Sequence, residues 1–245
     1  MDPRLPFWVA AGLSLTNGLY GFFVLPESLA KENRRPFSWA RANPIGALKL
    51  LRSHHELFGL ASVYFLNMLS HNALPSVFVL YTTLRYGWDE STVGLTLAGY
   101  GILTVIVQSA LVRRAVAKFG ERRTLLTGLA AAFLCFVIYG LAPTPYIFWA
   151  GSAIAAFWGF YGPASQGLMS RRVSASEQGQ LQGALSSIMG ITGLIGPILF
   201  TETFAYAITP EHALAVSGAP MLLAAMIIAV AGVLAWRVTQ PAATP

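Results

Sequence analysis

The sequence predicts an all-α polytopic membrane protein with seven transmembrane helices, and three observations carry this prediction. Of its 245 residues, 55% are hydrophobic and only 11% are charged, which is too little charge for a soluble domain. Two uncharged runs, 91–112 and 124–141, are each long enough to cross a hydrocarbon core of about 30 Å at about 1.5 Å per residue. Between them, segment 113–123 (R-R-A-V-A-K-F-G-E-R-R) carries five cations. This pattern is typical of a short loop that joins two membrane helices.

Seven apolar spans follow one another along the chain. The first, 5–26, has no small-residue cleavage site after a basic region, so we expect a helix rather than a signal peptide. The A-P-T-P turn at 142–145 divides a long uncharged stretch in two, because proline breaks helices. The other predicted spans are 57–84, 91–112, 124–141, 146–170, 180–207 and 213–236. The predicted division is a transmembrane helix (1–27), a basic cytoplasmic loop (28–56), a six-helix bundle (57–237) and a short tail (238–245).

Lysine and arginine fall almost entirely on one side of the predicted membrane. Fourteen lie in alternate connecting segments: six in 28–56, five in 113–123, two in 171–180, and Arg237. Only Arg4 and Arg85 lie on the other side. Because Lys and Arg are retained on the cytoplasmic side of short loops, we expect a multi-pass inner (plasma) membrane protein with its N-terminus outside and its C-terminus in the cytoplasm.

Several classes of function are disfavoured by the same composition. The net charge of +6 does not indicate nucleic-acid binding, because the cations lie in short loops. The single cysteine, Cys135, lies in an apolar run, so we expect no intramolecular disulfide, no metal site and no cofactor. The G-x-S-G motif of an intramembrane serine protease is absent, and no predicted span holds the lysine that a retinal protein needs. We therefore expect a protein that is not an enzyme.

The segment L-V-R-R-A-V-A-K-F-G-E-R-R resembles the second-half copy of a cytoplasmic loop motif of the major facilitator superfamily, G-x-x-x-D-R-x-G-R-R. Aligned on Gly120, the motif's first Gly falls on Arg113, its Asp on Ala117 and its first Arg on Lys118, so this copy is degenerate. Six further motifs resemble the tetracycline-resistance branch of the drug:H⁺ antiporters in their order and spacing. They are L-P-E-S (25–28), R-Y-G-W-D (85–89), L-A-G-Y-G-I-L (97–103), G-P-A-S-Q-G-L-M-S-R (162–171), Q-G-Q-L-Q-G (178–183) and G-L-I-G-P-I-L-F-T (193–201).

This resemblance implies a fold and a function. Such proteins have two six-helix bundles with a substrate site near the midplane between them. The first span resembles the last helix of the N-terminal half and the other six resemble the C-terminal half, so the expected partners are a missing N-terminal half or another copy, the lipid bilayer, protons and a small-molecule substrate. The implied function is proton-coupled efflux of a small amphipathic compound or drug. The alternatives are a truncated half-transporter without activity of its own and a seven-helix membrane protein that does not transport.

Polar residues in the second span form the first part of a candidate substrate path. Asn67 and His71 recur on one helical face, with Asn72 beside them and Pro75 bending the helix. Polar residues in a membrane span face the bundle interior or a wet cavity, so they either line the path or form hydrogen bonds between helices. His71 is the only histidine within a predicted span, which makes it a candidate proton carrier.

The third and fifth spans supply the rest of the predicted path. Tyr100, Thr104 and Gln108 are spaced by four residues and form a second polar stripe. Tetracycline exporters resemble this helix but have His at the position of Thr104, and Asp where the next helix has Ala131, so tetracycline itself is a doubtful substrate. In the fifth span the predicted path residues are Trp158, Tyr161 and, toward the cytoplasmic end, Gln166. The alternative for the two aromatic residues is packing in the core.

The cytoplasmic loops supply a predicted gate that holds the cytoplasmic helix ends together. Its members are Arg113, Arg114, Lys118, Gly120, Arg122 and Arg123. S-x-x-E at Ser174 and Glu177 is a capping-box pattern, with Glu177 pairing to cytoplasmic arginines as the alternative.

The sixth span has two further features. Gly193, Gly196 and Pro197 predict a bending helix at the interface of the two bundles. Glu202 is the only carboxylate inside an apolar run, about 36 Å along the helix from Gln178, so we expect it at the outer interface or, alternatively, at a proton site.

Overall fold

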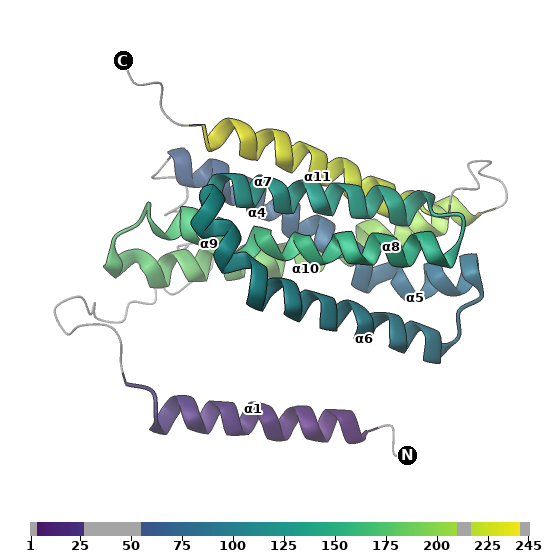
Figure 1. Cartoon of the computed structure of the whole chain (residues 1–245), viewed down its shortest axis with the longest axis horizontal. Coiled ribbons are helices and arrows are strands. Elements are labelled where there is room, and N and C mark those ends of the chain that lie inside the picture. Colours follow the sequence, from purple (N-terminus) through teal and green to yellow (C-terminus); the bar gives the residue numbers. More distant parts are fainter. Residues whose placement is uncertain (1–3, 27–54, 210–216, 241–245) are drawn as a thin grey trace. The chain divides into compact units, whose positions relative to one another are not determined.

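The computed structural model describes residues 4–26, 55–209 and 217–240, and every regular element within these ranges is a helix (Figure 1). The predicted all-α class is confirmed. The chain divides into two compact units, 1–36 and 37–245, which are treated separately below. Most of the predicted cytoplasmic loop 28–56 and of the tail 238–245 lies outside the described residues, so the proposed domain division stays a prediction.

The first unit contains α1, Leu5–Phe23, which matches the first predicted span. Its 19 residues extend about 28 Å at about 1.5 Å per residue, and Pro6 lies in its first turn, where a missing N–H costs no hydrogen bond. The side chains of Phe7, Trp8 and Phe22 are each more than 70% exposed. Such large exposed apolar groups are typical of a helix that lies in lipid or packs on other helices.

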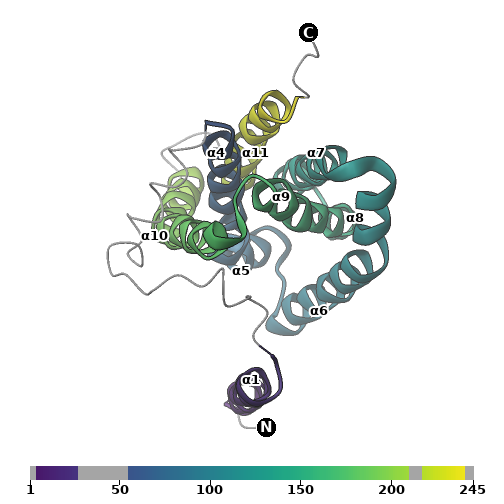
Figure 2. The same ribbon diagram turned by 90° about the vertical axis from the view of Figure 1, so that its left-hand side faces the viewer.

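The second unit contains helices at the other six predicted spans. The second span is broken at Asn72 into α4 (His55–His71) and α5 (Ala73–Tyr86), three residues before Pro75. The remaining helices are α6 (Glu90–Ile106), α7 (Val112–Leu141), α8 (Pro145–Ala155), α9 (Tyr161–Ser170), α10 (Gln178–Ile208) and α11 (Ala219–Val238). Figures 1 and 2 show α11 lying beside both α7 and α4.

Four helical stretches among the described residues are long and apolar enough to cross a membrane: Leu57–Tyr86, Glu90–Leu141, Ala175–Ile208 and Ala219–Val238. The 52-residue stretch Glu90–Leu141 would extend about 78 Å if straight, more than twice a hydrocarbon core. It folds back on itself between α6 and α7 and so supplies the third and fourth spans (Figure 1). The fifth span is α8 and α9 joined by a 3-10 turn, Ala156–Phe160, and is not one long α-helix.

The connection 113–123 is helical, whereas the sequence suggested a short loop. α6 passes through a π-helical turn, Val107–Leu111, into the first turns of α7, and the chain changes direction at Gly120. Gly120 has a φ of 79°, a backbone conformation that glycine adopts without strain. At the start of this helical connection, Val112 and Ala115 are buried in one apolar cluster with Phe160.

The helix ends on the predicted outer side are joined by hydrogen bonds. The carbonyl oxygen of Ala142, in the turn between α7 and α8, accepts a hydrogen bond from Arg85 Nε (3.0 Å) and another from Tyr86 Oη (2.8 Å). Arg85 Nη1 also donates to Ser217 Oγ (3.2 Å), just before α11. Phe148 stacks on Tyr139 below this cluster, with ring centroids 4.1 Å apart. The ends of α5, α7, α8 and α11 therefore form one fixed cluster.

Two capping interactions fix helix starts in the second unit. The backbone N–H of Thr92 donates to Asp89 Oδ1 (2.9 Å) at the start of α6. Hydrogen bonding with Thr92, first through its side chain and then through its backbone N–H, lowers the pKa of the Asp89 carboxyl. The predicted capping box is confirmed: Glu177 Oε2 accepts from Ser174 N (2.9 Å), and the Ser174 side chain caps the same turn. This turn leads directly into α10.

α10 runs continuously through Pro197 as a helix of 31 residues. Gly196 is a close-packing position, since a Cβ there would lie 2.5 Å from Asn72 Cβ, whereas a Cβ on Gly193 would meet no atom within 4 Å. The bending that we expect at these positions stays a prediction. Glu202 is exposed on α10, six residues before the helix ends.

Candidate functional site

A hollow of about 460 Å³ lies between α4, α6 with its π-helical extension, and the segment that leads into α9. Seven of the nine predicted path residues line it, although they come from three separate helical segments. They are Asn67, His71, Tyr100, Thr104, Gln108, Trp158 and Tyr161. The sequence pattern placed these residues on three helical faces, and the fold turns the three faces toward one another.

Trp158 joins the α4 wall to the α9 wall. Its indole N–H donates to Asn67 Oδ1 (2.8 Å), and both side chains are buried. Its ring also lies between Phe136 and His71, with centroid distances of 5.3 and 5.2 Å. Asn67 therefore lines the hollow and also accepts a hydrogen bond from another helical segment, the two arrangements that the sequence left open.

The α6 wall contains an unsatisfied hydroxyl. Thr104 Oγ1 is buried and has no hydrogen-bond partner among the described residues. A buried polar group without a hydrogen bond costs about 1 to 3 kcal/mol, so a hydrogen bond from a ligand to this hydroxyl would be favourable. Gln108 lies in the π-helical turn and covers Gly159, where a Cβ would be 3.2 Å from Gln108 Cγ. Such π-helical turns are frequent at functional sites.

Two predicted path residues, Asn72 and Gln166, do not line this hollow. Asn72 lies at the break between α4 and α5, where its side-chain amide donates to Met68 O (2.8 Å) and packs against Gly196 of α10. Gln166 is half-buried on α9, closer to the end at Ser170. For Asn72, the sequence periodicity could not separate this position from the lining, because the helix ends at His71 and a new helix begins at Ala73.

His71 is the one residue of this lining whose side chain ordinarily titrates near neutral pH. It is exposed at the hollow and lies against Trp158. No Lys, Arg, Asp or Glu is among the described residues that line the hollow. The groups offered to a ligand are therefore an imidazole, two phenols, an indole, two amides and a hydroxyl.

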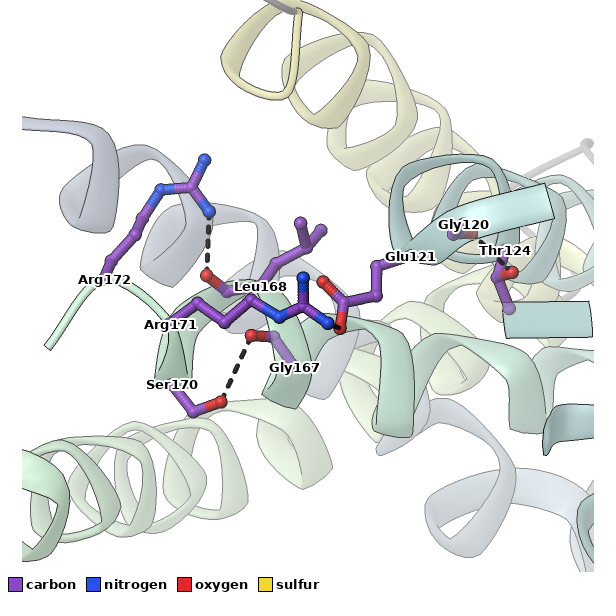
Figure 3. Close-up of polar contacts among 8 residues, drawn as sticks. All are labelled: Gly120, Glu121, Thr124, Gly167, Leu168, Ser170, Arg171 and Arg172. Atoms are coloured by element: carbon purple, nitrogen blue, oxygen red, sulfur yellow. Dashed lines mark hydrogen bonds and ion pairs between the residues drawn. The ribbon is translucent and has the colours of Figure 1, made fainter. Parts of the chain in front are cut away.

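An ion pair joins α7 to the end of α9 on the predicted cytoplasmic side (Figure 3). Arg171 Nη2 lies 2.9 Å from Glu121 Oε1, with the Glu121 side chain only 14% exposed. The carboxylate rests over Gly167, where a Cβ would come within 2.5 Å of Glu121 Oε1. Sequence reasoning missed Glu121, although a lone carboxylate within five cations was a usable signal.

Of the predicted gate residues, Arg122 makes the contacts between helices. Its Nε donates to Thr239 Oγ1 (3.2 Å) and its Nη2 to Trp236 O (3.4 Å), so a cation lies at the C-terminal end of α11, where the helix dipole favours positive charge. The others are exposed: Arg113, Arg114, Lys118 and Arg123. Arg172, on the same side, donates to Leu168 O (2.7 Å; Figure 3).

A bundle of membrane-length helices that encloses a polar hollow is the architecture of a membrane transporter. Residues 60–245 match the profile of the Major Facilitator Superfamily. The chain belongs to the Major Facilitator Superfamily, whose members are transporters and not enzymes. The resemblance to its tetracycline-resistance branch is confirmed by the relatives described next.

Several curated proteins are similar over most of this chain. The class B tetracycline resistance protein of Escherichia coli is 37% identical over 215 residues, which cover 85% of this chain and 52% of that protein. The class C protein of Escherichia coli is 31% identical over 219 residues, covering 89% and 55%. The Hippocampus abundant transcript 1 protein of Homo sapiens is 29% identical over 201 residues, covering 80% and 41%. The chain thus spans about half the length of the curated relatives it matches.

Two solved structures have a similar fold. The human organic anion transporter MFSD10 (TETRAN) aligns with a TM-score of 0.79 at 20% identity, over 93% of this chain and 56% of that one. The Escherichia coli fucose:proton symporter FucP aligns with a TM-score of 0.68 at 17% identity, over 97% and 55%. At these identities the similarity shows the fold alone.

Proposed function

We propose that this chain is the C-terminal part of a secondary transporter that exports a small amphipathic compound against proton influx. The observation that carries the proposal is the gathering of seven polar and aromatic residues from three helical segments around one hollow. Transporters of this fold bind their substrate near the midplane, between two bundles. The proposed location is the inner (plasma) membrane, with the N-terminus outside and the C-terminus in the cytoplasm.

The chemistry of the lining supports an amphipathic substrate. Aromatic rings from Tyr100, Trp158 and Tyr161 suit a flat apolar body, and the neutral groups of Asn67 and Thr104 suit a polar substituent. The unpartnered hydroxyl of Thr104 is the group best placed to bind the substrate, because occupancy would satisfy it.

Proton coupling is assigned to His71 in this proposal. In the tetracycline-resistance branch that the chain resembles, this half has a His where Thr104 lies and an Asp where Ala131 lies, so any proton carrier in this chain must lie elsewhere. His71 lines the hollow, and an imidazole is the side chain whose unperturbed pKa lies nearest neutrality. Glu202, the other candidate, is exposed on α10 and is not part of the hollow's lining.

The proposed transport cycle needs a second bundle, either an N-terminal half or another copy of the chain. A polar hollow that faced hydrocarbon would cost several kcal/mol for each unsatisfied group, so its open side needs a cover. At the cytoplasmic end, the Glu121–Arg171 pair and the Arg122 contacts hold α7, α9 and α11 together, which supports their proposed part in the gate.

The test compares two Thr→Val variants that remove a hydroxyl at nearly constant volume. Thr104→Val removes the unpartnered hydroxyl of the hollow, and Thr127→Val removes an exposed hydroxyl that donates only to its own helix, at Arg123 O. The assay is uptake of ethidium into inverted vesicles that contain the chain with a complementing five-helix bundle. Loss of one hydrogen bond worth about 1 kcal/mol weakens apparent affinity about fivefold in Thr104→Val only. Equal affinity in both variants would place the substrate elsewhere.

The alternative is a half-transporter with no activity of its own, and the open side of the hollow favours it for the isolated chain. The purified 245-residue chain in liposomes should then show no proton-driven export, while co-expression with five complementing helices should raise its level and restore export. Export by the chain as a monomer would contradict the half-transporter interpretation.

A further inference from the structure

A second hollow, of about 420 Å³, lies between α6 and α8 toward the predicted outer end of the bundle. Figures 1 and 2 both show these two helices side by side. Tyr100 lines this outer hollow and also the inner hollow described above. The two hollows are therefore neighbours that share one side chain.

A polar stripe on α6 connects the two hollows. Thr92, Thr96 and Tyr100 line the outer hollow, and Tyr100, Thr104 and Gln108 line the inner one, with successive members four positions apart in the sequence. Residues four apart lie one turn apart on almost the same face, so polar groups follow one another at about 6 Å along the helix.

The outer hollow has walls that are held in place. Trp149 Nε1 donates to Thr96 Oγ1 (3.0 Å), and the Trp149 ring stacks on Trp88, with centroids 5.7 Å apart at 29°. At its base, Ser152 Oγ and Tyr139 Oη lie 2.9 Å apart in a buried hydrogen bond. The Trp149 side chain is still 42% exposed, so part of its aromatic surface is available to a ligand.

We propose that the outer hollow is a second binding site for the exported compound, on its way out of the inner hollow. The ligand class is a planar aromatic amphiphile that stacks on Trp149 and places a polar substituent beside Thr92, which lines the hollow and is partly exposed. The proposal rests on the export function proposed above.

Cysteine labelling tests the site in the membrane. The only native cysteine, Cys135, is fully buried, so an introduced cysteine reports its own position. Gly99→Cys lies in the outer hollow and Gly162→Cys in the inner one, and a Cβ at either position meets no atom within 4 Å. Met226→Cys, on the exposed face of α11, is the lipid-facing control.

A charged maleimide should label Gly99→Cys and should not label Met226→Cys. Ethidium at ten times its dissociation constant should slow labelling at Gly99→Cys about tenfold, because only about a tenth of the sites stay free. Failure of the maleimide to label Gly99→Cys would show that lipid fills the hollow and would overturn the proposal. Protection at Gly162→Cys without protection at Gly99→Cys would overturn the outer site alone, and protection at neither would overturn the export function as well.

Discussion

Gly128→Ala is the substitution for which the structure gives the clearest energetic expectation. A Cβ at Gly128 would lie 2.7 Å from Tyr161 N and 3.1 Å from Tyr161 Cα, whereas non-bonded heavy atoms prefer about 3.5 Å or more. These are backbone atoms, so α7 and α9 must separate by nearly 1 Å. Overpacking of this kind costs about 1 to 3 kcal/mol, at the upper end here, and the better helix propensity of alanine returns about 1 kcal/mol. The net destabilisation should be about 2 kcal/mol.

The measurement is thermal unfolding of the detergent-purified protein, together with ethidium affinity. We expect the midpoint to fall by about 4 to 8 °C, and affinity to fall as well, because Tyr161 lines the inner hollow. Gly232→Ala, on α11, is the matched control, since a Cβ there meets nothing within 4 Å, and it should be neutral or slightly stabilising. If Gly128→Ala were as stable as Gly232→Ala, the close approach of α7 and α9 would be refuted.

Three further predictions concern topology, the ion pair and the substrate. Reporter domains fused after Gln180 and after Arg237 should be cytoplasmic and one placed in 86–90 external; a cytoplasmic result for the last would contradict the proposed orientation. Glu121→Gln and Arg171→Gln, with the double variant, should give a coupling energy below about 1 kcal/mol, because the Arg171 side chain is 76% exposed; a coupling above about 2 kcal/mol would mean that the pair is desolvated. Without the ionisable groups that its relatives have in this half, the complete transporter should give little proton-coupled tetracycline export, and protonophore-sensitive tetracycline uptake into inverted vesicles would contradict this.

Helical periodicity predicted most of the hollow because each wall is a single helical face. Asn67 and His71 lie one turn apart, as do Tyr100 and Thr104, and packing of the helices brings these faces together. Periodicity extends only as far as the helix is regular. At Asn72 the break between α4 and α5 turns the next residues toward α10, which is why Asn72 itself is outside the hollow.

Other features depend on contacts between segments far apart in sequence, so no local pattern could predict them. Glu121 forms an ion pair with Arg171, fifty residues further along the chain. Its carboxylate also needs the space over Gly167, which a larger residue at that position would occupy. Val112 and Ala115, at the start of the cationic segment, are likewise buried with Phe160, which lies forty-five residues beyond Ala115. The sequence contained the charges and the glycines, but their partners are defined only by the fold.

The fixed contacts at both ends of the second unit indicate where motion can occur. On the predicted outer side, Ala142 O accepts hydrogen bonds from α5, and Arg85 also reaches Ser217 before α11. On the cytoplasmic side, Arg122 joins α7 to the end of α11 while Glu121 joins α7 to α9. Helices tied to α11 and α7 at both ends cannot separate without breaking several of these contacts together. We therefore expect α5, α7, α8, α9 and α11 to move together as one rigid body, so that the hollow opens and closes mainly against the second bundle proposed above.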